Sequence, residues 1–291
     1  MKKALLILLM VALAAPIFAR DIDAVVTADW LAANLTNSKV VVVDVRKVED
    51  YKAGHVPGAV SMLGSVFYVP AKGLNNELPF MDDLSDALKE AGISVDSQVV
   101  IVEADGSRFS TATRVAWTLA YAGLDNVSVL SGGQAAWVKA GKPVATDTVK
   151  KAAGTFVAKP RAAYLALKAD VIASKGQVVD ARAYDTYFGL SKQAFVAQAG
   201  HLPGAYSLPY SWITNADGLV KSKDELAKMP AALGLDSGVP TIVLCDSGVL
   251  ATTWWWIMKE YLGWPTVANY DGSSQEITAD PSVKYVTLVW R

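Results

Sequence analysis

The stretch VVVDVR at residues 41–46 returns as QVVDAR at residues 177–182, and this repetition decides the fold. Three further features recur in the same order. GHVPGA at 54–59 is matched by GHLPGA at 200–205, VVIVE at 99–103 by TIVLC at 241–245, and VSVLSGG at 127–133 by TVANYDG at 266–272. Because the four features keep their order at an offset of roughly 140 residues, we infer that the chain is a duplication of one structural unit.

Each repeat alternates short apolar strands with stretches of helical spacing. The strands are apolar on both faces, which is typical of a parallel sheet covered by helices. Helices are expected over residues 82–91, 111–121, 224–233 and 252–262. The sequence therefore predicts two α/β domains, residues 21–145 and 161–291, each with a central parallel sheet flanked by helices. The polar, alanine-rich residues 146–160 are the expected linker.

Residues 1–19 have the composition of a secretory signal peptide. Two lysines precede an unbroken apolar run from residue 4 to residue 15, and Ala19 offers a small residue at the cleavage point. The apolar run is too short for a membrane anchor. We therefore expect a cleaved signal peptide and a mature periplasmic chain with no attachment to the membrane.

Composition excludes several classes of function. The net charge is −1 and there is no basic run, which argues against a nucleic-acid partner or an anionic membrane surface. A single cysteine excludes an intrachain disulfide and a CxxC thiol oxidoreductase. Two histidines without a Cys/His cluster make a zinc site improbable. We expect neither a metal nor a cofactor.

Cys245, the only cysteine, follows the apolar strand at 241–244 and opens a loop that leads into the helix expected at 252–262. Such a junction presents unpaired backbone N–H groups that favour negative charge, so we expect a lowered thiol pKa. The alternative is a buried structural cysteine. A lone thiol is easily oxidised in the periplasm, so its presence there favours a functional role.

Three motifs resemble those of a known family. YKAGHVPGA at 51–59 resembles the N-terminal signature of rhodanese domains, and VANYDGSSQE at 267–276 resembles their C-terminal signature. The Cys-x-x-Gly-x-x-Ala loop at 245–251 resembles the active-site loop of tandem-domain thiosulfate and 3-mercaptopyruvate sulfurtransferases. The resemblance covers almost all of the mature chain. It implies two rhodanese folds, with catalysis only in the second.

The resemblance also implies a mechanism. A cysteine thiolate takes sulfur from a small-molecule donor, becomes a persulfide, and passes the sulfur to an acceptor, which is a thiol, cyanide or a protein. Asp180 ends the first strand of the second half, where the family's equivalent acid helps to fix the loop; a shared structural role with Asp44 is equally open. The predicted site consists of Cys245, Asp246, Ser247, Gly248, Val249, Leu250, Ala251 and Asp180.

The loop departs from the family at positions that bear on the donor. Thiosulfate-preferring relatives carry cations directly after the cysteine, whereas this chain has Asp246 and Ser247, and no arginine occurs between Arg182 and Arg291. A carboxylate beside the thiolate should repel anionic donors and raise the thiol pKa. Ordinary thiosulfate turnover is therefore doubtful. Arg182 is expected to pair with a carboxylate, because Arg46 repeats it in the first half.

The first half is expected to be non-catalytic. Glu103 stands at the position of the cysteine, and a carboxylate cannot carry a persulfide, so a structural loop is favoured over a cleft lined by Glu103 or Arg108. Arg114 could equally be a surface charge. His55 and His201 occupy the same turn of both halves, so a hydrogen bond to nearby backbone is favoured over a general-base role.

Trp254, Trp255 and Trp256 stand on the helix after the loop. Because three successive side chains span most of a helix circumference, at most two are expected in the core. Packing against the sheet and the other domain is favoured over an aromatic wall for an apolar donor or a protein partner.

Three classes of function are compatible with the sequence. A periplasmic sulfurtransferase working through a Cys245 persulfide is favoured. The second is a non-catalytic sulfur- or chalcogen-binding or protein-interaction module, which the missing arginines and Asp246 support. The third, a cysteine phosphatase, is the weakest, because it needs an arginine that closes the loop where the chain has Ala251 and Thr252.

Overall fold

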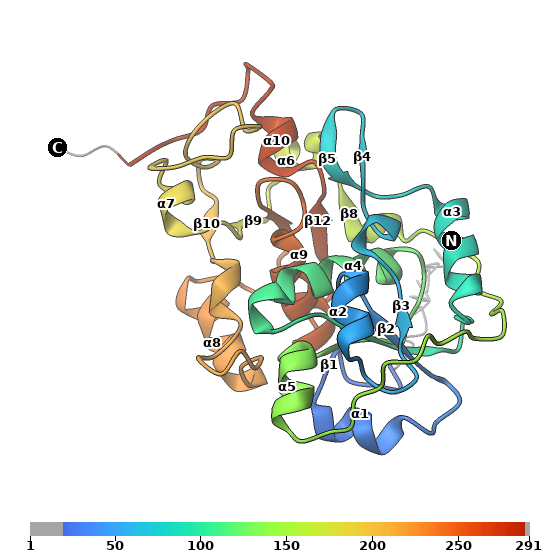
Figure 1. The fold of residues 1–291 in the computed structure, drawn as a ribbon. Helices are drawn as coiled ribbons and strands as arrows, with labels where there is room; N and C mark the ends of the chain where they lie inside the picture. The colour runs from blue at the N-terminus through green and yellow to red at the C-terminus, as the bar shows by residue number, and fades with distance from the viewer. Residues whose placement is uncertain (1–19, 289–291) are drawn as a thin grey trace, which may run out of the picture.

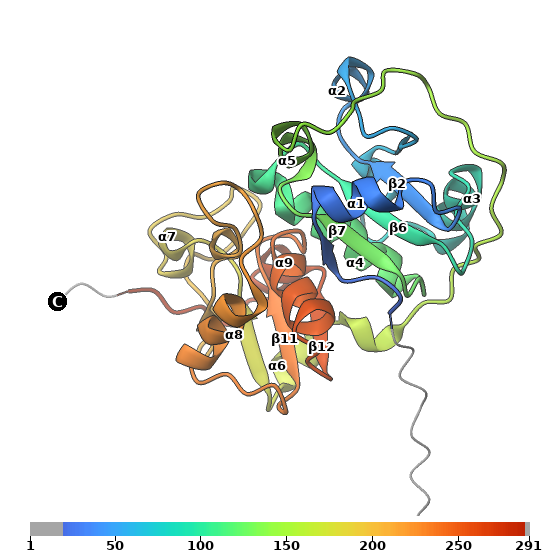
Figure 2. The same ribbon diagram turned by 90° about the horizontal axis from the view of Figure 1, so that it is seen from below.

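The computed structural model describes residues 20–288. Two five-stranded sheets, one in each half of the chain, form the cores of two domains that pack side by side (Figures 1 and 2). The predicted signal peptide, residues 1–19, lies outside the described residues.

The first sheet has the strand order β1-β7-β6-β2-β3, and all of its strand pairs are parallel. Its strands are β1 (Val25–Val26), β2 (Val40–Asp44), β3 (Val60–Ser61), β6 (Gln98–Val102) and β7 (Val127–Leu130). The helices of this half are α1 (Ala28–Asn34), α2 (Val48–Ala53), α3 (Met81–Glu90), α4 (Phe109–Tyr121) and α5 (Gly133–Lys139). A separate antiparallel hairpin, β4 (Val69–Ala71) and β5 (Leu74–Glu77), precedes α3.

The second sheet has the order β10-β9-β11-β12-β8 and is also parallel throughout. Its strands are β8 (Leu165–Ala166), β9 (Gln177–Asp180), β10 (Tyr206–Ser207), β11 (Thr241–Leu244) and β12 (Val267–Tyr270). Its helices are α6 (Lys168–Ala173), α7 (Tyr184–Tyr187), α8 (Lys223–Ala232), α9 (Ala251–Trp255), a π-helix (Trp256–Tyr261) that continues α9, and α10 (Ser273–Ile277).

The predicted fold class is confirmed in both halves. β2 is buried along its whole length, as expected of a strand covered on both faces. Its register with β6 runs from Val40 opposite Gln98 to Asp44 opposite Val102, and the register of β9 with β11 repeats this pairing in the second half. The predicted helices agree with α3, α4, α8 and α9 to within two residues at each end, the helix after the loop becoming a π-helix beyond Trp255.

Residues 146–160 cross the outer side of the first domain in an extended conformation (Figure 2). The segment is anchored there by backbone hydrogen bonds, with the Gly154 N–H donating to Lys89 and the Phe156 N–H to Ile93. The Phe156 side chain is buried in the hydrophobic core. The expected linker is therefore packed against the first domain.

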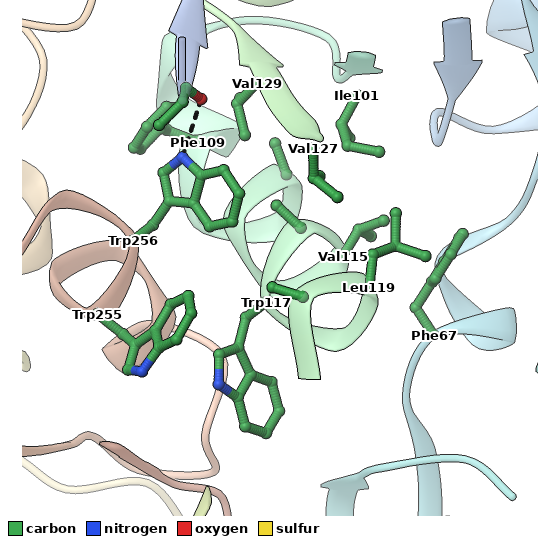
Figure 3. Close-up of a cluster of buried hydrophobic side chains, with 14 of the residues drawn as sticks. Phe67, Ile101, Phe109, Val115, Trp117, Leu119, Val127, Val129, Trp255 and Trp256 are labelled. Atoms are coloured by element: carbon green, nitrogen blue, oxygen red, sulfur yellow. Dashed lines mark hydrogen bonds between the residues drawn. The ribbon is translucent and has the colours of Figure 1, made fainter. Parts of the chain in front are cut away.

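α4 of the first half packs against α9 of the second, and this contact joins the two cores (Figure 3). The side chains of Trp254, Trp255 and Trp256 are all fully buried. The Trp256 indole donates to the carbonyl of Ala24 in the first domain at 3.0 Å, and the Trp254 indole donates to Pro209 within its own domain. The prediction that at most two of the three belong to the core is wrong, because the helix has its own sheet on one side and the other domain on the opposite side.

Candidate active site

Cys245 directly follows β11, whose neighbours in the sheet are β9 and β12. Residues 245–251 lead from this strand to α9, at the carboxyl edge of the sheet, as the sequence predicts. The thiol is enclosed, since only 1% of Cys245 is exposed. Such burial is expected of a structural cysteine, whereas the position at the carboxyl edge of the sheet is expected of a reactive one.

The loop curls around the sulfur. The backbone N–H groups of Ser247 and Ala251 face the thiol as donors and on their own lower its pKa. Ser273 closes the other side, with its hydroxyl 4.0 Å from the sulfur. That hydroxyl accepts the N–H groups of Cys245 and Gly248, both at 3.1 Å. The arrangement is the expected cradle of donors, and Ser273 is a member that the sequence analysis did not single out.

The thiol pKa is nevertheless raised. Burial is the main cause, and the carboxylate of Asp246 adds to it, whereas the N–H groups of Ala251 and Ser247 and the hydroxyl of Ser273 act in the opposite direction. The expected lowering of the thiol pKa is therefore wrong, although the donors that would cause it are present. The expectation that Asp246 raises this pKa is confirmed.

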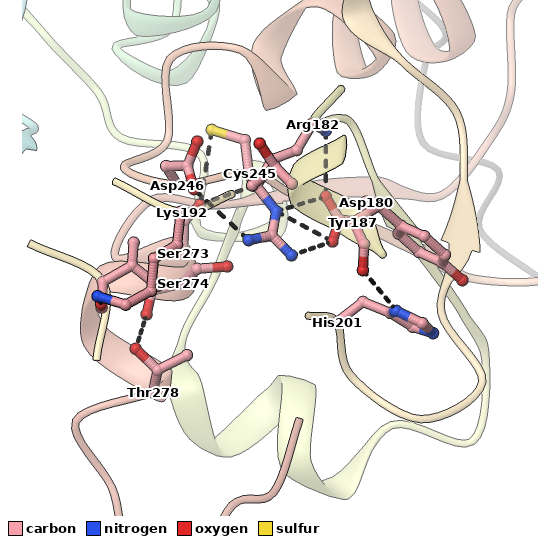
Figure 4. A network of polar contacts seen from close by, with 12 residues as sticks. Asp180, Arg182, Tyr187, Lys192, His201, Cys245, Asp246, Ser273, Ser274 and Thr278 are labelled. Carbon is pink, nitrogen blue, oxygen red and sulfur yellow. Dashed lines mark hydrogen bonds and ion pairs between the residues drawn. The ribbon is translucent and has the colours of Figure 1, made fainter. Parts of the chain in front are cut away.

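Arg182 lies between two carboxylates of the site (Figure 4). It binds Asp180 at 2.6 Å and the carbonyl of Gly200 at 2.7 Å, so its expected pairing with a carboxylate is confirmed. Its remaining terminal nitrogen, Nη1, faces Asp246 Oδ1 at 3.5 Å without a hydrogen bond to any residue. Burial raises the pKa of Asp246 even though Arg182 lowers it. Asp180 is thus linked to the loop only by way of Arg182, whose Nη1 faces Asp246.

The first half repeats only part of this network. Arg46 binds Asp44 at 2.7 Å and the carbonyl of Gly54 at 2.7 Å, in the same way as its counterpart in the second half. Ala104 stands at the position of Asp246 and supplies no third charge. The arginine–aspartate pair is therefore a shared structural feature, and the facing carboxylate is specific to the half that has the cysteine.

Both histidines are structural, as predicted. His55 and His201 place Nδ1 at 2.8 Å from the carbonyls of Tyr51 and Tyr187, respectively, and each ring stacks on that tyrosine. Glu103 is half-buried and binds the N–H of its neighbour Ala104, and its burial raises its pKa.

Arg114 is fully buried, so its alternative as a surface charge is excluded. It extends from α4 of the first domain into the second, where it forms an ion pair with Asp271. Its Nη1 donates to the carbonyl of Gly248 in the cysteine loop at 3.3 Å, and its Nη2 donates to the carbonyl of Asn76 at 2.5 Å. An arginine in the middle of a helix that has no other charged residue is the sequence signal that could have identified it.

The β4–β5 hairpin of the first domain covers the loop. The Asn76 side chain donates to the Ser247 hydroxyl at 2.8 Å. The Gln275 side chain accepts the N–H of Asn75 and donates to the carbonyl of Gly73. These contacts link a hairpin of one half to the loop and to α10 of the other.

A cavity of about 1100 Å³ lies between this hairpin and α10. Its wall includes Asp271 and Gly272, which support the cysteine loop, but it does not include Cys245. Glu77 lines it, and burial together with the charge of Asp271 raises the pKa of Glu77 to about 7. This cavity is therefore next to the loop and does not reach the thiol.

Across residues 20–288, no helix is both long and apolar enough to cross a membrane. Within the same range, no group of three or more His, Cys, Asp or Glu side chains is arranged to hold a metal ion.

Comparison with known proteins agrees with the duplicated fold. The family model for rhodanese-like domains matches twice, at residues 27–140 and 165–280. A protein of Mycobacterium leprae named "Putative thiosulfate sulfurtransferase" is 34% identical, over 87% of this chain and 94% of its own. The sulfur carrier protein TtuD of Thermus thermophilus is 28% identical, over 87% of this chain and 93% of its own.

Among solved structures, SseA from Escherichia coli is similar. It is described with the rhodanese fold and the catalytic mechanism of the 3-mercaptopyruvate sulfurtransferases. The TM-score is 0.76 at 27% identity, and the match covers 87% of this chain and 99% of SseA.

Proposed function

The chain belongs to the rhodanese-like family, and from this premise we propose that it is a sulfurtransferase that carries sulfur as a persulfide on Cys245. The cradle carries the proposal: the hydroxyl of Ser273 lies 4.0 Å from the Cys245 sulfur, and the N–H groups of Ser247 and Ala251 favour the thiolate. Such donors stabilise a thiolate and the anionic sulfur of a persulfide. The names of the relatives support the same class of reaction.

The reaction consists of two displacements without net oxidation. The Cys245 thiolate attacks the transferable sulfur of the donor, an S–S bond forms, and the donor's own bond to that sulfur breaks with its electron pair. A thiol or cyanide acceptor then attacks the outer sulfur. The Cys245 S–S bond breaks, and its electron pair returns to the thiolate.

Donor preference follows from the charges around the loop. Arg182 is paired with Asp180 and also faces Asp246, so two carboxylates already compensate the positive charge that it could offer to an anionic donor. Asp246 repels an approaching dianion. We therefore propose that mercaptopyruvate or polysulfide is a better donor than thiosulfate, and that a small thiol, cyanide or a protein thiol accepts the sulfur.

Access to the thiol requires a movement of the cover. Because the thiol is enclosed and Asn76 of the hairpin binds Ser247 of the loop, a donor must displace this contact to reach the sulfur. Residues 1–19 have the composition of a signal peptide, and we propose that the sulfur transfer takes place in the periplasm.

Steady-state transfer to cyanide tests the proposal. Thiocyanate formation should be measured with mercaptopyruvate, polysulfide and thiosulfate. The wild type should turn over at least one of them, and Cys245→Ser should turn over none while keeping the same melting temperature. Turnover by Cys245→Ser equal to that of the wild type would overturn the role of the thiol.

The raised thiol pKa and the enclosed sulfur favour a second candidate, a module that binds sulfur species without transferring them. Such a module would bind polysulfide but form no thiocyanate. The same assay, combined with a binding measurement, separates the two.

A further inference from the structure

We propose that Arg114 is a positioning residue for the Cys245 loop. Through this arginine, the first domain, which has no cysteine, sets the geometry of the loop that contains Cys245. The inference rests on the proposed function for its importance, but its geometry and its test stand on the loop alone.

Arg114 is attached to the second domain at two points. Its guanidinium forms the ion pair with Asp271, at the end of β12, and donates to the carbonyl of Gly248 at 3.3 Å. The side chain is fully buried, so the charge cannot be satisfied by solvent if these contacts are lost. Two aromatic rings of the first domain pack against the guanidinium. Its carbon lies 4.8 Å from the ring centroid of Trp117 and 5.8 Å from that of Tyr68.

The Gly248 peptide is the point at which this arginine acts on the loop. Gly248 has φ +78°, and a Cβ there would meet the backbone oxygen and the carboxylate of Asp271 at 2.4 Å. Its N–H donates to Ser273, while its carbonyl accepts from Arg114 and, at 3.4 Å, from Asn269. Both ends of this residue are therefore fixed, one of them from the other domain.

Fixing Gly248 fixes the donors of the cradle. The N–H of Ser247 precedes it in the loop and that of Ala251 follows it, and both groups lower the pKa of the Cys245 thiol. If the Gly248 carbonyl is released, these N–H groups can turn away from the sulfur, and the thiolate loses the donors that stabilise it. Arg114 thus acts on the thiol through the backbone and does not touch it.

Arg114 also holds the cover of the loop. Its Nη2 donates to the carbonyl of Asn76, whose side chain binds Ser247. The same guanidinium therefore ties together the hairpin, the loop and β12. Loss of the arginine should change both the acidity of the thiol and the access to it, and the two effects can be measured separately.

A second ion pair between the domains provides a matched control. Arg20 of the first domain pairs with Glu260 of the second, and its guanidinium also donates to the carbonyl of Val127. Neither partner contacts residues 245–251. Arg20→Gln therefore removes an arginine bridge between the domains without touching the cysteine loop.

The test is the pH dependence of iodoacetamide alkylation of the single cysteine in the full chain. The midpoint of the profile reports thiol acidity, and the plateau at high pH reports access. Arg114→Gln should raise the midpoint by about one pH unit, which lowers the alkylation rate at a fixed pH below the midpoint about tenfold. Arg114→Lys keeps a charge for Asp271 but cannot make the other contacts together, so it should show a smaller upward shift.

A merely structural bridge predicts a different result. If Arg114→Gln has the wild-type midpoint, or if Arg20→Gln shifts it equally, the positioning role is overturned. Should Arg114→Gln fail to fold, Arg114→Lys decides, and a wild-type midpoint for the lysine variant overturns the role. Alkylation needs no sulfur donor, so a wild type that never forms a persulfide refutes the proposed function and leaves this result intact.

Discussion

The carboxylate of Asp246 directly follows the reactive cysteine in the chain, and Asp246→Asn should lower the thiol pKa of Cys245. The carboxylate is one of the two causes that raise this pKa. The amide has nearly the same shape but no charge. It also leaves Nη1 of Arg182 without the facing carboxylate that now lies at 3.5 Å, so a buried cation becomes available to the thiolate.

The size of the effect is an order-of-magnitude value from Coulomb's law for two charges on adjacent residues. Two unit charges about 6 Å apart interact by about 3 kcal/mol at an effective dielectric constant near 20. Because Arg182 already compensates part of the charge of Asp246, we expect about half of this, which corresponds to a fall of about one unit in the thiol pKa. The residue is 7% exposed, so added salt should change the shift little.

Alkylation of the single cysteine as a function of pH measures the shift, and Asp105→Asn in the equivalent loop of the first half is the control. The same Asp246→Asn variant should gain more in thiosulfate turnover than in mercaptopyruvate turnover, by on the order of tenfold, because only the dianion gains strongly from loss of the carboxylate. A thiol pKa equal to that of the wild type, together with unchanged thiosulfate kinetics, would refute this reasoning.

Three further outcomes are expected. Asn76→Ala removes the contact of the hairpin with Ser247, so the plateau rate of alkylation at high pH should increase, and an unchanged plateau would mean that the hairpin is not the cover. Burial raises the pKa of Glu77 to about 7, which favours its protonated form in the folded state, so stability from this group is present at low pH and is lost as pH rises from about 4.5 to about 7. In urea unfolding, Glu77→Gln should therefore be more stable than the wild type at pH 8, by about 1 kcal/mol after discount for solvent screening, and equal to it at pH 4. Trp256→Ala should cost about 3–5 kcal/mol in the same assay, and a cost below 1 kcal/mol would contradict its place in the joint core.

The fold was predictable because its signals are local and occur twice. The apolar strands 41–44 and 177–180 each carry their own evidence of burial on both faces, and the turn around His55 repeats at His201. The same repetition favoured a structural role for the histidines and a carboxylate partner for Arg182, since a feature that also occurs in the half without the cysteine is not specific to sulfur chemistry, whereas it left the role of Asp180 open.

The errors have a common physical cause, which is burial that no local sequence pattern shows. A lowered thiol pKa follows from the donors of the loop alone, but Cys245 is enclosed and Asp246 lies beside it, and both raise the thiol pKa. Likewise, Trp256 and Arg114 are fully buried, and each has a partner in the other domain: Trp256 donates to Ala24, and Arg114 pairs with Asp271. Local sequence patterns in one half do not predict which of its side chains the other half will cover.

The central claim is that Cys245 carries sulfur, and intact-mass measurement of the mature chain tests it most directly. After incubation with mercaptopyruvate, polysulfide or thiosulfate and removal of the free donor, the wild type should gain about 32 Da, the mass of one sulfur atom, on the peptide that contains Cys245. The gain should disappear on addition of cyanide, and Cys245→Ser should show none. An unchanged mass with all three donors would contradict the account.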